Sequence, residues 1–231
     1  MKEISVTDLF KAKIHFGHLK RFVSPNMFQY IHKTNNNMSI LNLDLTLIGL
    51  KNALNFIENI IINNGNILFV GTKRQASNLI KIYAEKINMP YVNFRWLGGS
   101  LTNYNTIKNS ISKLIQLEDN FKKNKNEYLT KKETLKATKQ LAKLKLNLQG
   151  IKNMTILPSA LFIIDINYET IAVLEAKKLN IPIIGIVDSN SNPENIDYVI
   201  PGNDDSTDSI KFYLNLISNH IIKIKEKQKL N

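Results

Sequence analysis

Three short and wholly apolar runs in this chain each end at a glycine or an aspartate, and helical patterns alternate with them. The runs are Ile67–Val70 before Gly71, Ala160–Ile164 before Asp165, and Ile183–Val187 before Asp188. Runs of this length and composition are typical of strands that are buried on both faces of a parallel sheet. Right-handed crossovers place the intervening helices on both sides of such a sheet. The sequence therefore predicts an open, mostly parallel α/β fold, with Tyr91-Val92 as a further short strand.

The N-terminal residues show a helix followed by a hairpin. Ser5 is the expected N-cap of this helix, Asp8 occupies its third position, and Gly17 is expected to end it. Strand-like runs on both sides of the asparagines at 35–37 predict a β-hairpin within residues 28–43.

Two further helices have recognisable limits. Asp44 or Thr46 is expected to cap a helix that closes at Asn64-Gly65. A last helix is expected to begin near Ser206 and to fray from Lys223 onward.

Residues 105–150 interrupt the alternation of strands and helices. Their leucines and isoleucines recur at helical spacing in two blocks, joined by the polar run at 122–126. We expect a helical hairpin that projects from the sheet. The chain then divides into a first part of the α/β domain (1–104), a coiled-coil-like hairpin (105–150), a second part of the α/β domain (151–222) and a basic C-terminal tail (223–231).

Charge is distributed unevenly along the chain. The formal net charge is +12, which makes a polyanion the first candidate partner. Residues 151–210 nevertheless carry nine acidic and three basic side chains. We therefore expect two faces with different partners, nucleic acid on the basic face and a basic protein on the acidic one. The acidic residues Asp197, Asp204, Asp205 and Asp208 are alternatively solvated caps of the last helix.

Cysteine is absent from the 231 residues. This excludes disulfides, zinc–thiolate sites and cysteine nucleophiles, and it fits a reducing compartment. No apolar run is expected to reach the length of a membrane span, and the first residues lack the apolar core of a signal peptide. We expect an unexported protein of a bacterial cytosol, or one encoded by an organelle.

The run Arg95–Tyr104 holds the only tryptophan, a glycine pair and several hydroxyl and amide donors. A glycine pair lets the backbone approach another molecule closely. Ser100 and Thr102 stand where a helix is expected to begin, and the free N–H groups of a helix start attract anions. Arg95 adds a guanidinium suited to phosphate. The run is either a phosphate-contacting loop or a glycine-rich turn anchored by a buried tryptophan.

Gly71-Thr72-Lys73-Arg74 follows a predicted strand and begins a helix, the position at which doubly wound folds bind phosphates. Its spacing matches neither the Walker motif nor the dinucleotide motif. Two adjacent cations fit an external phosphate backbone better than a mononucleotide. We expect both Lys73 and Arg74 to lie outside the core.

His15 and His18 have the spacing of a metal-ligand pair. Asp188, Asp204 and Asp205 would complete an oxygen-rich site if the acidic part folds against the N-terminus. The alternative is that the histidines are held by hydrogen bonds in the packing or contact RNA. The sequence requires no cofactor, and a bound divalent metal is an option.

No local arrangement of His, Asp and Ser is placed for proton relay, and Gly98-Gly99-Ser100 is not the elbow of a serine hydrolase. We therefore expect a protein that is not an enzyme. The alternative is a nucleotide- or sugar-phosphate-binding α/β enzyme that uses Gly71–Arg74 and Gly98–Ser100 as phosphate loops. A third option is a metal-dependent regulatory protein built on the histidine and aspartate candidates.

Several segments, taken in order, resemble the ribosomal protein S2 family of bacteria and organelles. They are residues 15–18 (HFGH), 67–74 (ILFVGTKR), 95–103 (RWLGGSLTN), 157–165 (LPSALFIID), 181–183 (IPI), 188–190 (DSN) and 200–205 (IPGNDD). The ordered set covers the chain almost from end to end. The chain departs from the family at Leu19-Lys20, where a polar pair is more usual.

This resemblance implies a flavodoxin-like (Rossmann-like) domain with a protruding helical hairpin. It also implies a structural constituent of the small ribosomal subunit that binds small-subunit rRNA, contacts neighbouring small-subunit proteins and supports subunit assembly. Docking of ribosomal protein S1 at the acidic part, for translation initiation, is implied as well. No membrane is implied, and the expected location is the cytoplasm or, for an organelle-encoded chain, the stroma or matrix.

The leading hypothesis is therefore an rRNA-binding protein with two sets of contact residues. The cations expected to neutralise phosphates are Lys20, Arg21, Lys73, Arg74, Arg95 and Lys108. The residues expected to shape the close contact are Trp96, Gly98, Gly99, Ser100, Thr102, Asn103 and Tyr104.

Overall fold

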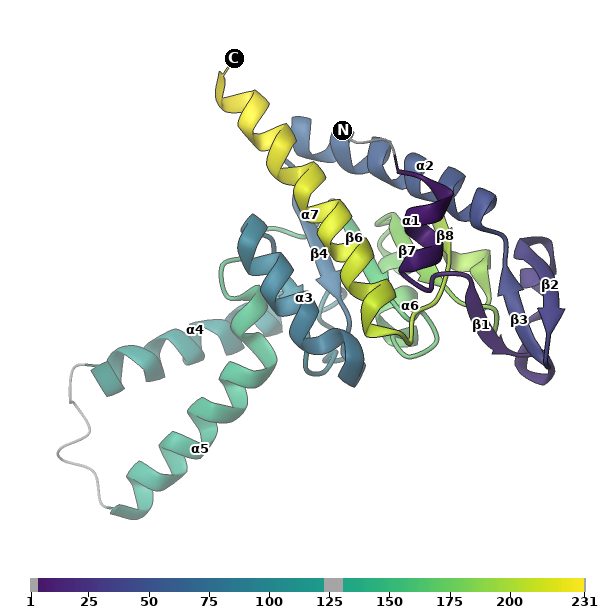
Figure 1. Ribbon diagram of the computed structural model, residues 1–231. Coiled ribbons are helices and arrows are strands. Elements are labelled where there is room, and N and C mark those ends of the chain that lie inside the picture. The colour runs from purple at the N-terminus through teal and green to yellow at the C-terminus, as the bar shows by residue number, and fades with distance from the viewer. Residues whose placement is uncertain (1–3, 123–130, 231) are drawn as a thin grey trace.

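A five-stranded sheet with helices on both faces forms the centre of the molecule (Figure 1). The computed structural model describes residues 4–122 and 131–230. The strands are β4 (Ile67–Val70), β5 (Tyr91–Val92), β6 (Ala160–Ile164), β7 (Ile183–Val187) and β8 (Tyr198–Pro201). They lie in the order β5-β4-β6-β7-β8, and every neighbouring pair is parallel. The predicted fold class is confirmed.

The sheet separates two hydrophobic cores. Ile67 and Phe69 of β4 enter one core, whereas Leu68 and Val70 enter the other, as expected for a strand buried on both faces. The helices of the first core are α1 (Val6–Lys11), α2 (Leu43–Ile62), α3 (Arg74–Ile87) and α7 (Thr207–Leu230). Those of the second are α6 (Thr170–Lys178) and parts of α4 (Tyr104–Lys122) and α5 (Lys131–Leu148).

One strand of the sheet, β8, is not among the strands predicted from the sequence. Its four residues end at Pro201, and a proline argues against a strand within a sheet. A proline is tolerated there because β8 lies at the edge of the sheet, where no further strand needs its N–H.

The helices α2 and α7 each differ from the predicted limits at one end. Asn42, and neither Asp44 nor Thr46, caps α2, because its side chain accepts a hydrogen bond from the Asp44 amide. The last helix α7 continues to Leu230 instead of fraying from Lys223. Packing explains this extension, since Ile224 is still buried in the first core.

The predicted capping box of Ser5 and Asp8 begins α1. The expected end of this helix at Gly17 is wrong: α1 ends at Lys11, and Gly17 lies in β1 (Phe16–Leu19). A side chain at Gly17 would place its Cβ 2.7 Å from Ser189 Oγ. This residue therefore allows β1 to approach the loop after β7.

β1 belongs to a separate antiparallel sheet with the order β1-β3-β2. Its other strands, β2 (Ile31–Asn35) and β3 (Met38–Leu41), form the predicted hairpin. Asn36 and Asn37 turn the chain with φ values of 46° and 63°, a pair of left-handed residues that suits a two-residue hairpin turn. Short 3-10 helices cover Lys20–Phe22 (η1), Pro25–Tyr30 (η2), Gln149–Ile151 (η3) and Pro193–Asn195 (η4).

The helices α4 and α5 lie side by side and project from the body of the molecule (Figure 1). Ile107, Ile111 and Leu114 of α4 are buried, whereas Leu135 of α5 is 59% exposed. The two predicted helices are thus present. Apart from Lys122, the expected connector falls outside the described residues, and the division of the chain into domains stays a prediction.

In the described part of the chain, α2 is the one helix with the length and apolar composition of a membrane span. This differs from the expectation that no apolar run reaches that length. Leu50, Leu54 and Ile57 of α2 are buried in the first core. A core helix of a globular domain meets the same criterion, so α2 is weak support for membrane insertion.

Candidate nucleic-acid interface

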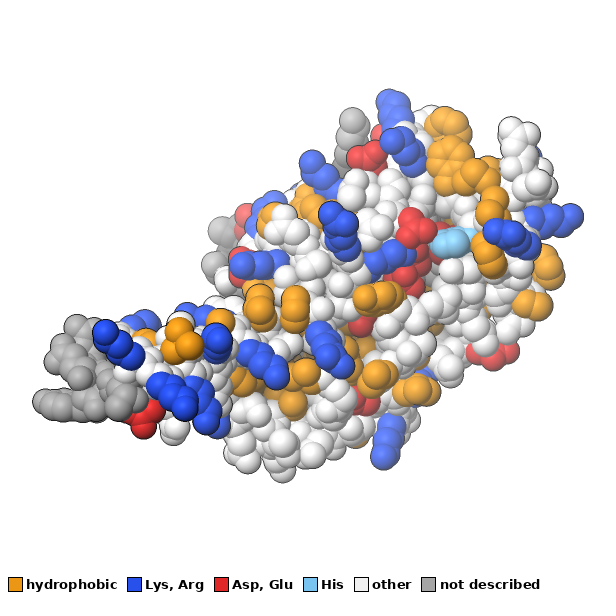
Figure 2. Space-filling model, turned by 90° about the horizontal axis from the view of Figure 1, so that it is seen from below, with side chains coloured by type: hydrophobic (Ala, Val, Ile, Leu, Met, Phe, Trp, Pro, Cys, Tyr) orange, Lys and Arg blue, Asp and Glu red, His pale blue; other side chains and the backbone are white. Residues whose placement is uncertain are grey.

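The predicted site residues gather where the strands end. Loops after β4, β6, β7 and β8 bring Lys73, Asp165, Asp188 and Asp204 together, at the edge where open parallel sheets hold ligands. Figure 2 views the molecule from below and shows carboxylates beside a histidine in the middle of this face. Lys and Arg side chains lie around them and along the hairpin.

Lys73 is held inside this group of carboxylates. Its Nζ lies 2.7 Å from Asp165 Oδ2 and 3.2 Å from Asp204 Oδ1, and it also contacts Asp205. Burial alone lowers the pKa of Lys73, but the charge of Asp204 and the hydrogen bonds to Asp165 and Asp205 outweigh it and raise the pKa. Lys73 does not lie on the open surface, as a position outside the core implies, because its side chain is only 16% exposed and already paired. Its contact with rRNA stays a prediction.

Asp204 is deeply buried within the cluster. One carboxylate oxygen faces Lys73, and the other, Oδ2, has no hydrogen-bond partner among the described residues. Burial, with the charges of Asp165 and Asp188, raises the pKa of Asp204 to about 8. Lys73 therefore compensates the surrounding carboxylates only in part, and Asp204 holds a proton up to a pH of about 8.

His18 borders the same cluster. Its Nδ1 lies 3.1 Å from Asp188 Oδ2, and its Nε2 lies 3.3 Å from Asp205 Oδ2. The hydrogen bond to Asp188 raises the pKa of His18, and partial burial opposes that effect. His18, Asp188 and Asp205 each offer one ligand atom within 4.8 Å of the others. The structure thus brings three of the five predicted metal ligands together, with Asp204 beside them.

His15 has a different environment from His18. Its ring stacks on Phe10 at a centroid distance of 4.4 Å and lies 4.1 Å from the ring of Phe16. Its Nδ1 has no partner among the described residues, and burial lowers its pKa. The expected pairing of His15 with His18 at one ion is not formed, because His15 lies against the rings of Phe10 and Phe16 whereas His18 faces Asp188 and Asp205.

The loop Arg95–Tyr104 closes around a carboxylate from α6. Glu175 Oε1 accepts hydrogen bonds from Trp96 Nε1 (3.0 Å) and the Gly99 amide (2.7 Å). Its Oε2 accepts from the Leu101 amide (2.9 Å) and from the amide and hydroxyl of Thr102 (3.1 Å each). Burial alone raises the pKa of Glu175, but these hydrogen bonds lower it below the usual value. The loop does bind an anion, and that anion belongs to the protein.

This arrangement changes the roles expected for the tryptophan loop. Trp96, Ser100 and Tyr104 are buried, and Gly99 adopts a φ of +86° that suits glycine. These four residues fix the conformation of the loop through buried contacts and backbone geometry. Gly98, Thr102 and Asn103 are exposed, as is Arg95.

A second carboxylate occupies the other predicted phosphate loop. Glu169, the residue before α6, accepts a hydrogen bond of 2.6 Å from the Thr72 amide through its Oε1. Burial raises the pKa of Glu169. With Lys73 paired and the Thr72 amide taken, the turn after β4 offers no open cradle for a mononucleotide.

Five of the six predicted cations are exposed on the surface. They are Lys20, Arg21, Arg74, Arg95 and Lys108. Within residues 4–122 and 131–230 none of them takes part in an ion pair. Arg21 lies 4.6 Å from the ring centre of Phe22 and Lys108 lies 5.0 Å from that of Tyr104, so aromatic contacts orient both charges.

The acidic part of the chain is largely internal. Asp165, Glu169, Glu175, Asp188 and Asp204 are buried. Of the expected acidic surface cluster, Asp197 pairs with Lys177 at 3.0 Å and Asp208 pairs with Lys13 at 2.9 Å. The expected acidic face is therefore smaller than the sequence indicates.

Sequence reasoning misses the two glutamates that fill the loops and one exposed aromatic residue. Glu175 lies between Ala172 and Ala176 on the buried side of α6. A charged residue on an otherwise apolar helix face indicates a buried group that needs hydrogen-bond partners, and this pattern could have identified Glu175 from the sequence. Phe94 is 53% exposed and stands next to Arg95, a combination suited to stacking on a base. Its neighbours in the sequence gave no sign of its exposure.

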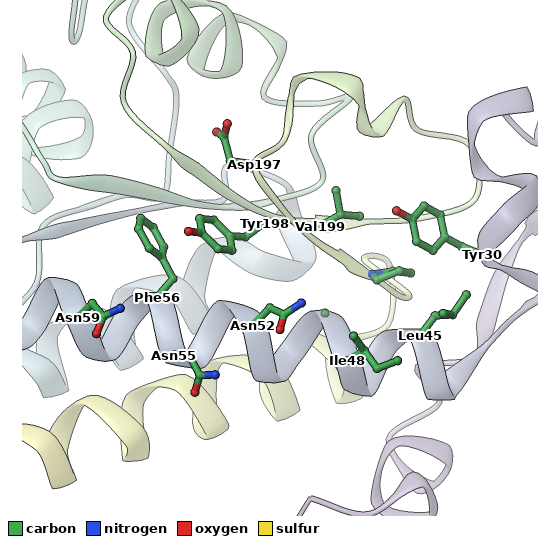
Figure 3. Close-up of a pocket in the computed structure, with 12 residues that line it drawn as sticks. Tyr30, Leu45, Ile48, Asn52, Asn55, Phe56, Asn59, Asp197, Tyr198 and Val199 are labelled. Atoms are coloured by element: carbon green, nitrogen blue, oxygen red, sulfur yellow. The ribbon is translucent and has the colours of Figure 1, made fainter.

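A groove on another part of the molecule lies between α2 and β8 (Figure 3). Its volume is about 570 Å³, and its lining includes Asn52, Phe56 and Tyr198. The rings of Phe56 and Tyr198 stack at 4.1 Å. No Lys or Arg lines the groove, so it lacks the charge that a nucleic acid requires.

Comparisons with known proteins agree with this geometry. The family model of ribosomal protein S2 matches residues 9–223. The small ribosomal subunit protein uS2 of Hahella chejuensis is 49% identical over 94% of this chain and 86% of its own length. Those of Acinetobacter baylyi (47%, over 96% and 90%) and Marinobacter nauticus (46%, over 98% and 90%) are similar. These relatives are named as ribosomal proteins, which confirms that the chain is not an enzyme. The chain belongs to the ribosomal protein S2 family.

Proposed function

We propose that this protein is a structural component of the small ribosomal subunit and binds small-subunit rRNA through the sheet edge and the hairpin. The observation that carries the proposal is the set of five exposed cations without ion-pair partners in the described part of the chain. Arg74 and Arg95 stand at the ends of β4 and β5, and Lys108 continues the set onto α4. Relatives named as small-subunit proteins support the same conclusion.

A macromolecular polyanion fits this edge better than a small metabolite. Both loops that would bind a metabolite phosphate are filled by Glu169 and Glu175, whereas the cations point outward around them. Separated outward cations match successive phosphates of a backbone, and they position it without reading its sequence. The exposed lysines of the hairpin, among them Lys113, Lys136 and Lys143, extend the basic surface.

The salt dependence of binding to the small subunit tests the proposal. If the five cations each neutralise one phosphate, the logarithm of the affinity falls with the logarithm of salt concentration at a slope of about −3.5 to −4.5. Replacing Arg74 and Arg95 together by alanine should make this slope shallower by about two. Lys51→Ala is the matched control, because Lys51 is exposed on α2, away from this edge. An affinity insensitive to salt, or an equal effect of the control, contradicts the proposal.

The proposed location is the small ribosomal subunit in a bacterial cytoplasm, and neighbouring small-subunit proteins are proposed partners; relatives named as small-subunit proteins of bacteria support both. Docking of ribosomal protein S1 stays part of the proposal and finds limited support. Asp205 is 48% exposed although it pairs with Lys73 and His18, and Asp197 and Asp208 are paired with Lys177 and Lys13. Co-sedimentation of S1 with small subunits carrying Asp205→Asn, against the wild-type protein, tests this contact.

A divalent cation at His18, Asp188 and Asp205 is a second proposal. One imidazole nitrogen and two carboxylate oxygens suit zinc, and the unpartnered Oδ2 of Asp204 lies in the same anionic cluster. Such an ion would stabilise the junction between β1 and the sheet edge. Elemental analysis of the purified protein and of its His18→Ala variant tests this: equal metal content in both contradicts it.

A further inference from the structure

The loop between β5 and α4 is irregular, yet it carries cations proposed to meet rRNA. Residues 93–103 lie outside regular helices and strands. Two backbone hydrogen bonds close turns within the loop, from the Ser100 amide to Leu97 and from the Asn103 amide to Gly99. Side-chain hydrogen bonds add to these: Asn93 and Ser77 bond to each other, and the Ser100 hydroxyl donates to the Leu97 carbonyl. The buried side chains of Trp96 and Leu101 and the carboxylate of Glu175 hold the middle of the loop.

Glu175 acts as the centre of this loop. Five donors from four residues converge on its two oxygens, three of them backbone amides. Amides arranged in this way form a nest for an anion. Glu175 fills the nest from behind with a side chain that is 8% exposed, so a backbone phosphate of RNA is excluded from it.

The outward side of the same loop carries the contact groups. Arg95 directly precedes the anchored Trp96, and Asn103 directly follows Thr102, whose amide and hydroxyl both donate to Glu175. Arg95 and Asn103 are exposed. The backbone positions from which they project are therefore set by the contacts that Glu175 makes.

We propose that Glu175 is a positioning residue for rRNA binding: it holds the loop so that Arg95 and Asn103 meet the RNA, and it does not touch the RNA itself. This inference rests on the proposed function. The charge of Glu175 is required, because all its hydrogen bonds are accepted ones. A glutamine of the same size would turn an NH2 group toward two or three donors and lose those bonds.

A double-mutant cycle on the full chain tests the inference. Binding to small subunits that lack this protein is measured against KCl concentration for the wild type, Glu175→Gln, Arg95→Ala and the double variant. Arg95→Ala should make the salt slope shallower by about one. Glu175→Gln should make the slope shallower by nearly the same amount. The slope of the double variant should be close to that of Arg95→Ala, because both substitutions remove the same contact between Arg95 and the RNA.

The control variant is Glu85→Gln, which removes the same charge. Glu85 accepts a hydrogen bond of 2.7 Å from the Tyr91 hydroxyl and belongs to α3, outside the loop. Its salt slope should match that of the wild type. A general loss of negative charge would instead act alike in both glutamine variants.

Several outcomes overturn the inference. A folded Glu175→Gln variant that keeps the wild-type salt slope overturns it. Additive effects of Glu175→Gln and Arg95→Ala on the slope also overturn it. If Glu175→Gln does not fold, the Trp96→Phe variant is measured in its place. This substitution keeps an aromatic ring at a buried position and removes one of the five hydrogen-bond donors to Glu175. A smaller change in the same direction supports the inference, and an unchanged slope overturns it. A wild-type protein without salt-dependent binding refutes the proposed function, whereas an additive cycle refutes only the role of Glu175.

Discussion

Replacing Lys73 by methionine separates a structural cation from an RNA-contacting one. The substitution keeps the length of the side chain and removes the charge that Asp165, Asp204 and Asp205 share. Removing one partner of a buried ion pair costs about 3 to 5 kcal/mol, because the remaining charge stays buried without compensation. Lys73 is 16% exposed and Asp205 is 48% exposed, so we expect a cost of about 3 kcal/mol, at the lower end of that range.

Thermal unfolding measures this cost. For a domain of this size 1 kcal/mol corresponds to about 2 to 4 °C in Tm, so Lys73→Met should lower Tm by about 6 to 12 °C. The matched control is Arg74→Met, because Arg74 is the next residue and is exposed. It should change the free energy of unfolding by less than about 0.5 kcal/mol. Equal and small effects of the two substitutions would refute the assignment of Lys73 to the internal cluster.

Two further predictions follow from buried groups. The pKa of Asp204 is raised from 3.8 to about 8 in the folded protein. Between about pH 4 and pH 8 the folded state therefore binds a proton that the unfolded state has lost. The contribution of Asp204 to the free energy of unfolding falls as the pH rises through this range. Asp204→Asn should therefore gain in stability relative to the wild type between pH 5 and pH 8 in urea unfolding, and parallel pH profiles would contradict this. A side chain at Gly150 would overlap the Tyr91 carbonyl oxygen, whereas one at Gly98 would meet nothing within 4 Å. Gly150→Ala should cost about 1 to 3 kcal/mol and Gly98→Ala almost nothing, and equal costs in chemical unfolding would contradict the packing around η3.

The role of the tryptophan loop shows how far local sequence can reach. Its glycine pair and hydroxyl residues predict a loop that attracts an anion, and the amides do converge on one. The sequence cannot tell whether the anion comes from outside. Glu175 is 79 residues from Trp96 in the chain, and nothing in the local pattern of either segment points to the other.

The amino-acid sequence by itself determined the features that depend on neighbouring residues. The apolar strands β4, β6 and β7, the capping box of Ser5 and Asp8 and the asparagine turn follow from burial, capping and turn chemistry within a few residues. Tertiary structure alone decided which charges face solvent. Lys73 meets Asp204 across 131 residues, and only the convergence of strand ends at one edge of the sheet brings a lysine predicted to contact phosphate into an internal ion pair.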